Sequence, residues 1–275
     1  MHPRSFALVL LLIATPIGVV FAQAPSLDEA ISSPSPTPRL SAADIIAAYV
    51  ADYRQDRYAA DAITFGVNVP EHGQWTVNIT GNPVGEQWEV LLTDGLPEVK
   101  TFIYVIEPQT LEALHDGRLN PLTAQGKAFA GDYTPMRITM MEGYTPTEAE
   151  YDRINPLSFH FWTRGFPEVI PFGEGLTRRA HGSNFVAFYY EKGIRTAWYR
   201  LLPEEKVRDD PREQAMPFPT MIIAISGTTE GEVDGTRVSL EQGHTLFVPP
   251  NVTHKWWNET DTPTEAILIM FGEGA

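Results

Sequence analysis

The chain has 275 residues, and its 35 acidic side chains outnumber its 20 basic ones, giving a net charge of −15. This excess of acid disfavours binding to nucleic acid and to anionic lipid, because both require Lys and Arg at the contact. The absence of cysteine from the sequence excludes disulfides, thiol nucleophiles, iron–sulfur clusters and cysteine-ligated zinc.

Residues 1–22 have the pattern of a secretory signal peptide. Arg4 precedes an apolar run that ends in Val-Phe-Ala, the small-residue ending of a cleavage site. An uncleaved membrane anchor is disfavoured because Pro16 interrupts the run, which is shorter than the ~20 apolar residues of a spanning helix. We expect an exported mature protein, periplasmic or extracellular, that begins at Gln23 and has no membrane span. The Pro- and Ser-rich residues 23–40 predict a disordered linker.

Residues 41–140 are predicted to form an α+β domain. Ser41 is placed as a helix N-cap, and apolar residues follow at three- and four-residue spacing as far as Tyr53. Three alternating runs, separated by Glu-His-Gly and Gly-Asn-Pro, predict an antiparallel meander. The strand TFIYVI then leads into two short helices, the first ended by Gly117 and the second begun at Asn120.

This order of elements resembles the SCP2 sterol-carrier family over roughly residues 45–137. The resemblance is closest in the segment TFIYVIEPQTLEALHDGRLNPLTAQGKAFAGD, in its strand, its helix ends and its small residues. Members of that family enclose a tunnel for acyl chains or sterols, so the resemblance implies an apolar cavity. The alternative interpretation is that the same apolar face is plain core.

Residues 141–180 are predicted to be an inter-domain segment without clear periodicity. Aromatic residues concentrate in it, as they do where elements pack together: Phe159, Phe161, Trp162, Phe166 and Phe172. We interpret them as a seam between two domains, and His160 among them as a structural residue.

Residues 181–275 alternate short strands with turns and lack a helical pattern, which predicts an all-β sandwich or barrel. The pair Asp234-Gly235 is typical of a two-residue hairpin turn.

This part of the chain resembles the cupin superfamily, whose fold is a double-stranded β-helix barrel. The second cupin motif is present with its spacing, carried by Gly243, Pro249, His254 and Asn258. Asn251 stands where the family has glycine, and asparagine tolerates the left-handed backbone of such a turn.

The first cupin motif, which in the family supplies two histidines and a glutamate to a metal, is degenerate. With its closing glycine at Gly227, the glutamate position falls on Thr220. The histidine positions fall on other residue types: Gln214 and Met216 in one register, Glu213 and Ala215 in the other. A divalent transition ion needs three or four ligands, and only His254 remains, so we expect no metal and no cofactor. The alternative is a rearranged site built from His181, His244 and Glu213.

The predicted ligand-binding residues alternate along two strands and face the barrel interior: Thr220, Ile222, Ala224, His254, Trp256 and Asn258. They would form apolar walls with a few polar heads, the usual form of a small-molecule site. Their predicted partner is a small, largely apolar organic molecule, and Trp257 would face outward or toward a neighbouring subunit.

Three functions remain open at this point. The first is a binding module for an apolar ligand. The second is a cupin-type isomerase, lyase or oxygenase that uses His254 as acid/base or metal ligand. The third is a structural or assembly role, because the cupin resemblance implies homodimers formed through sheet edges. A second titratable group facing His254 would favour an enzyme, and Tyr199, Arg200 and Glu232 are the candidates.

Overall fold

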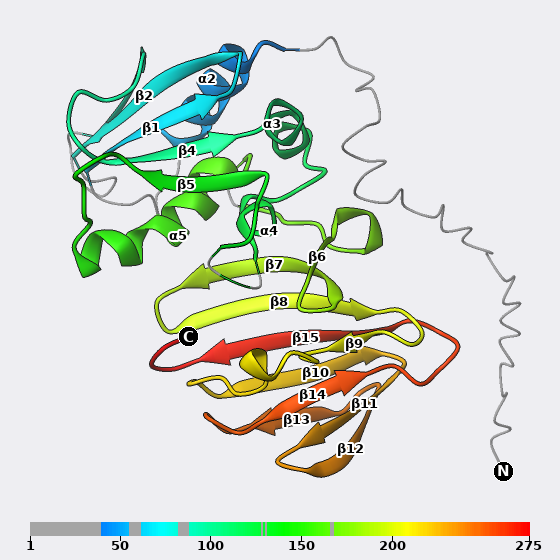
Figure 1. Cartoon of the computed structure of the whole chain (residues 1–275). Helices are drawn as coiled ribbons and strands as arrows, with labels where there is room; N and C mark the ends of the chain where they lie inside the picture. Colours follow the sequence, from blue (N-terminus) through cyan, green and yellow to red (C-terminus); the bar gives the residue numbers. More distant parts are fainter. Residues whose placement is uncertain (1–39, 55–61, 82–87, 128, 130, 166–167) are drawn as a thin grey trace, which may run out of the picture.

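The structure is a computed structural model that describes these residues: 40–54, 62–81, 88–127, 129, 131–165 and 168–275 (Figure 1). The predicted signal peptide, and the predicted linker apart from Leu40, lie outside the described residues. Within those ranges, no helix has the length and apolar character that a membrane crossing requires.

The first part of the chain is built on a five-stranded sheet in the order β3-β2-β1-β4-β5. Its strands are β1 (Ile63–Val69), β2 (Gly73–Thr80), β3 (Glu89–Asp94), β4 (Phe102–Ile106) and β5 (Met136–Met140). Strands β1 to β3 form the predicted antiparallel meander, and β4 pairs with β1 in parallel. Strand β5, which the sequence did not reveal, closes the sheet beyond β4.

Helices flank this sheet: α2 (Ala42–Tyr53), α3 (Pro108–His115), α4 (Pro121–Gln125) and α5 (Glu148–Trp162). Ser41 caps α2 as predicted, because its hydroxyl accepts from the Asp44 N–H at 3.1 Å. Asn120 caps α4 in the same way, accepting from the Thr123 N–H at 2.8 Å. Gly117 follows the end of α3 with a φ of 70°, a conformation that favours glycine.

Helix α5 was not predicted from the sequence. Ile154, Leu157 and Phe161 are spaced as on one helical face, but Pro156 lies between them and suggests a helix break. The structure keeps the helix, which begins at Glu148 and is preceded by Thr147 as the N-cap of a capping box.

The aromatic seam is only partly confirmed. Phe161 and Trp162 face the first core, where they pack with α2 and the sheet, so their placement between the domains is wrong. Phe159 does join the two parts, since its ring meets Tyr189 edge-on at 5.0 Å. Phe172 packs against residues of the second part, while Phe166 lies outside the described residues. His160 pairs with Glu168 at 2.6 Å, which fits a structural residue.

The second part is a barrel of two facing sheets (Figure 1). The first has six strands in the order β13-β10-β15-β8-β7-β6, and the second has four in the order β12-β11-β14-β9. The strands are β6 (Arg178–Ala180), β7 (Ser183–Glu191), β8 (Ile194–Leu201), β9 (Lys206–Val207), β10 (Thr220–Ser226), β11 (Thr228–Val233), β12 (Thr236–Glu241), β13 (Thr245–Val248), β14 (His254–Trp257) and β15 (Thr264–Phe271). The predicted hairpin turn is confirmed between β11 and β12, where Asp234 and Gly235 have φ values of 48° and 74°.

The two parts meet where α4 and α5 lie against β7 (Figure 1). Strand β6 pairs β7 only from Ser183 to Phe185, and Ala187 lies beyond that pairing. There the Asn120 amide donates to the Ala187 carbonyl, and the Ala187 N–H donates to the Thr123 hydroxyl, both at 2.9 Å. Side chains at the beginning of α4 therefore satisfy the backbone N–H and carbonyl of Ala187 on this part of the β7 edge.

Arg178 fixes the other end of α4. Its Nη1 donates to the carbonyl oxygens of Thr123, Ala124 and Gly126 at 2.8 to 3.0 Å. These carbonyls lie at the end of a short helix, where the Thr123 carbonyl also accepts from the Gly126 N–H at 3.2 Å. The cation therefore both caps α4 and joins it to β6.

We expect Arg178→Met to lower the free energy of unfolding by about 2 to 3 kcal/mol, because three carbonyls lose a charged donor. Urea denaturation measures the loss, and limited proteolysis should cut faster between α5 and β6. Arg179→Met is the matched control, since its side chain is 55% exposed and pairs with Glu205 at the surface. Equal losses in the two variants would contradict the role given to Arg178.

Candidate functional site

A cavity lies between the two sheets of the barrel. The space between its walls, including open solvent at its mouth, is about 600 Å³. Both sheets contribute apolar walls to it: Leu201, Val207, Ile222, Leu240, Ala266 and Leu268. The indole of Trp256 completes this lining and is almost fully buried. Because apolar residues alternate with polar ones along these strands, their apolar side chains share the inner face of the barrel and line the cavity.

Polar side chains enter the same cavity at a few places: His181, Tyr199, Arg208, Thr229, His254 and Thr264. Thr229 of β11 and Thr264 of β15 bond to each other through their hydroxyls at 2.9 Å and so join the two sheets. The other four side chains carry the ionisable groups of the cavity. His181 lies in the turn between β6 and β7, and Arg208 directly follows β9.

Three of the six predicted binding residues line the cavity, namely Ile222, His254 and Trp256. Ala224 is buried in the surrounding core, so it supports the wall without being part of the lining. Thr220, the first residue of β10, is also buried, but it is not among the lining residues. Strand alternation predicted that these side chains point inward, whereas the cavity occupies only part of the barrel's length.

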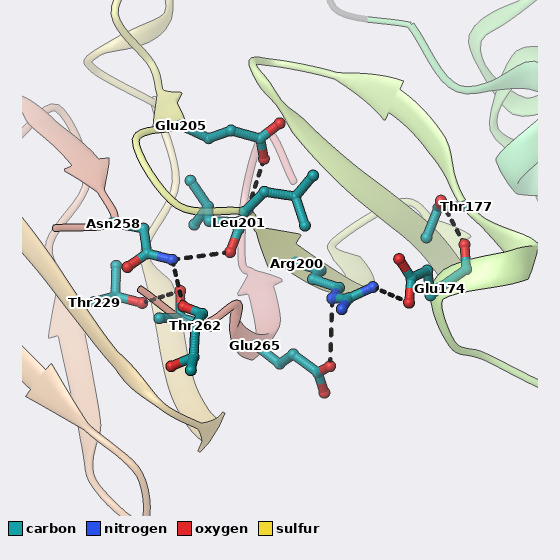
Figure 2. Close-up of polar contacts among 11 residues, drawn as sticks. Glu174, Thr177, Arg200, Leu201, Glu205, Thr229, Asn258, Thr262 and Glu265 are labelled. Carbon is teal, nitrogen blue, oxygen red and sulfur yellow. Dashed lines mark hydrogen bonds and ion pairs between the residues drawn. The ribbon is translucent and has the colours of Figure 1, made fainter. Parts of the chain in front are cut away.

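Asn258 holds the barrel together instead of lining the cavity. Figure 2 shows its amide nitrogen between two carbonyl oxygens, those of Leu201 at 3.1 Å and Thr262 at 2.8 Å. Its oxygen accepts from the Thr260 N–H at 2.9 Å. The prediction that Asn258 binds ligand is therefore corrected: these bonds tie the turn after β14 to the end of β8.

His254 is held by bonds on both its backbone and its ring. Its N–H donates to the Gln214 carbonyl at 2.7 Å, and its Nδ1 lies 3.0 Å from the Val252 carbonyl. Because a carbonyl only accepts, Nδ1 carries the ring proton and Nε2 is the acceptor. Burial, and then the positive charge of Arg208, lowers the pKa of His254 from 6.5 to about 4. His254 is therefore a neutral imidazole at pH 7.

Arg208 is a cavity-lining residue that the sequence did not reveal. It is only 8% exposed although its guanidinium stays charged in proteins. In the sequence it stands beside Asp209 and Asp210, in a charged run of the kind that is typical of a solvated loop. Nothing in that pattern separates a buried arginine from its exposed neighbours.

The backbone beside the cavity is unusual at two places. His181 and Arg208 have φ values of 54° and 60°, in the left-handed region that residues other than glycine rarely adopt. The Arg208 N–H reaches the His181 carbonyl at 3.4 Å, so the two strained residues are neighbours. Between them the chains approach closely, because a Cβ on Gly182 would lie 2.0 Å from the Lys206 carbonyl oxygen. Strain of this kind gathers at functional sites.

The three residues that the sequence suggested as titratable partners of His254 differ in whether they reach the cavity. Tyr199 lines the cavity together with His254. Arg200 instead pairs with Glu174 at 2.5 Å and lies 3.8 Å from Glu265, outside the lining (Figure 2). Glu232 pairs with Lys255 at 3.3 Å.

Where the structure describes their side chains, the residues at the first-motif positions form no metal site with His254. Gln214 contributes its backbone carbonyl to the His254 N–H, and Met216 packs near Phe218. His244 is exposed in the turn before β13, while the side chain of Glu213 lies outside what the structure describes.

The donor set of the cavity does not fit a transition metal. Among the described residues, no group of three or more His, Cys, Asp or Glu side chains is placed to hold an ion. The described lining offers two imidazoles, no carboxylate and the permanent cation of Arg208, which repels a metal ion.

Comparison with known proteins gives the family of this part of the chain. Residues 209–270 match the family model described as Cupin domain. This region is a cupin domain. Strands β7 and β8 lie before the matched residues and complete the six-stranded sheet of the same barrel. No curated protein matches the chain.

Solved structures resemble the cupin domain at low identity. A Cupin 2 conserved barrel domain protein from Salinispora arenicola is 17% identical, and the match covers 38% of this chain and 88% of that one at a TM-score of 0.34. An RmlC-like cupin from Shewanella frigidimarina is 20% identical over 39% of this chain and 92% of that one, at a TM-score of 0.32.

Proposed function

We propose that this chain is an exported protein that binds a small, largely apolar organic ligand in the cavity of its cupin domain without a metal ion. The observation that carries the proposal is the cavity itself, with apolar walls from both sheets and a few convergent polar groups. Small-molecule sites have this composition, in which the walls supply affinity and the polar groups orient the ligand. Export is inferred from the pattern of residues 1–22.

The binding proposal is tested with benzamide, a small neutral aromatic molecule. We expect the full-length chain to bind it in calorimetry, and Ala266→Phe to abolish binding by filling the cavity. Circular dichroism checks that the filled variant keeps its fold. Unchanged binding by a folded Ala266→Phe would place the ligand elsewhere.

Absence of a metal is tested separately. We expect elemental analysis of protein purified without chelator to find far less than one transition ion per chain. His254→Ala should weaken benzamide binding by removing a polar group of the cavity, and should leave the metal content unchanged. A content near one transition ion per chain in the wild type, which falls in His254→Ala, would establish a metal site. It would favour the oxygenase or isomerase alternative.

A second candidate function, an acid–base isomerase or lyase, is favoured by one specific observation. Tyr199 and His181 line the same cavity as His254, so a titratable partner for the neutral imidazole is at hand. Such an enzyme would use Nε2 of His254 to accept a proton and a second group to return one.

For the first part of the chain we infer the SCP2 fold, which the order of helix, meander, strand and two helices supports. We assign no ligand to it. Large aromatic side chains fill the space under its sheet, so the interpretation as plain core is preferred: Tyr49, Tyr53, Phe65, Tyr104, Phe161 and Trp162.

A further inference from the structure

We propose that the ligand of the cupin cavity carries a neutral hydrogen-bond donor, an O–H or N–H group, which bonds to Nε2 of His254. This inference rests on the proposed function of the cavity and specifies the chemical class of its ligand. It divides small aromatic molecules into those that offer a proton to the imidazole and those that do not, a distinction that apolar walls alone cannot make.

The first argument is the direction of hydrogen bonding at His254. Its Nδ1 lies 3.0 Å from the Val252 carbonyl oxygen, and a carbonyl only accepts, so the ring proton is on Nδ1. Nε2 therefore presents a lone pair. Among the described residues no group donates to Nε2, although His254 is only 3% exposed. A buried acceptor of this kind is stabilised by a donor that the cavity admits.

The second argument is the position of the imidazole ring. His254 lines the cavity, and so does Trp256, two residues further along β14. Alternate residues of a strand share one face, and the centroids of these two rings are 6.4 Å apart. The imidazole therefore lies beside an apolar aromatic wall. A ligand with an aromatic body and one donor contacts the indole with its ring while its donor bonds to Nε2.

The third argument is the charge state of the imidazole. Burial, and then the positive charge of Arg208, lowers the pKa of His254 from 6.5 to about 4. The lone pair on Nε2 is therefore free of a proton throughout the neutral pH range. A ligand group that only accepts, such as an ether oxygen, would place a second lone pair against it and leave both groups without a partner. The ring thus selects donors over acceptors.

The experiment compares phenol with toluene, which have nearly the same shape and are both neutral at pH 7.5, whereas only phenol has a donor. Calorimetry on the full-length chain gives the affinity of each probe for the wild type and for His254→Leu. Toluene is the more apolar probe, so the quantity to compare is the ratio of phenol affinity to toluene affinity. We expect this ratio to fall about fivefold or more in His254→Leu, the effect of one hydrogen bond. Toluene affinity should be kept or rise, because leucine is apolar.

Two further variants control the comparison. His244→Leu makes the same change at an exposed histidine in the turn before β13, and should keep the wild-type ratio. His254→Gln keeps an acceptor oxygen in the side chain and should retain part of the preference for phenol. Circular dichroism checks that each variant is folded.

A measurement on the wild type alone decides if His254→Leu fails to fold. The nitrogen NMR resonance of Nε2 should have the position of an unprotonated ring nitrogen. It should move toward that of a protonated nitrogen when phenol is added, because the hydroxyl then shares its proton with Nε2, and toluene should leave it in place. No movement at saturating phenol, or equal movement with both probes, overturns the proposal.

The calorimetric outcomes separate the two proposals. An unchanged ratio in folded His254→Leu, with binding of both probes lost in Ala266→Phe, overturns the donor and leaves the binding function standing. A ratio that falls equally in His244→Leu also overturns the donor. Failure of the wild type to bind any of benzamide, phenol and toluene overturns both proposals.

Discussion

Replacing Gly231 with alanine is expected to destabilise the cupin domain by about 3 kcal/mol, the upper range for overpacking a core. A Cβ at this position would lie 2.3 Å from Cε3 and 2.4 Å from Cζ3 of Trp256. The Lys255 carbonyl oxygen would be 2.9 Å away on the neighbouring strand. Because the indole is buried in the cavity wall, it can yield only by moving into the cavity. The variant should therefore also weaken benzamide binding.

Urea denaturation measures the effect of Gly231→Ala. Gly131→Ala is the control, because a Cβ there meets no atom within 4 Å. Shortening the indole in the double variant Gly231→Ala/Trp256→Leu should give a loss smaller than the sum of the single losses, since the clash is removed. Additive losses, or equal stability of the two alanine variants, would show that the close approach is not what requires glycine.

Lowering the pH from 6.5 to 4 is expected to cost the wild type about 3 kcal/mol through His254 alone. The pKa of this group is about 4 in the folded chain, against 6.5 as its ordinary value. Between those values the unfolded chain binds the proton and the folded one does not. Acid therefore favours unfolding, and the full stability contribution is present only above pH 6.5.

The measurement is the free energy of unfolding from pH 7.5 to 4 for the wild type and for His254→Gln. Glutamine keeps polar atoms but does not titrate, so its profile should be flatter by the contribution of His254. The carboxylates of the chain titrate in both proteins and cancel in the difference. If the free energy of unfolding varied with pH in the same way in both proteins, His254 would not be a neutral buried imidazole in the folded chain.

Most strands of the cupin domain were predictable because they have alternating runs bounded by turn residues. Strands β6 and β9 were not predicted, since three and two residues are too few to show alternation. His254, Ile222 and Trp256 were found in the same way, since motif spacing and strand period fix the side that each residue faces. Asn258 belongs to the same motif, yet its amide is used by backbone carbonyls, and no sequence pattern distinguishes those partners from a ligand.

The features that the sequence did not reveal depend on contacts between distant segments. Pro156 suggests the end of a helix, and only packing against the first core keeps α5 continuous around it. Arg208 becomes a cavity residue because β9 pairs with β14 and carries the next residue inward. A local window of sequence contains neither contact.

The contact of α4 with β7 also occupies backbone groups that another strand could pair with. An exposed strand edge offers unpaired N–H and carbonyl groups to any other strand, and so serves as a template for aggregation. The side chains of Asn120 and Thr123 use both backbone groups of Ala187 where β6 has already ended. A barrel separated from its first part would expose that edge, with the aromatic ring of Phe185 beside it. In the full chain, these two groups of β7 are therefore already bonded and not open to a strand of another molecule.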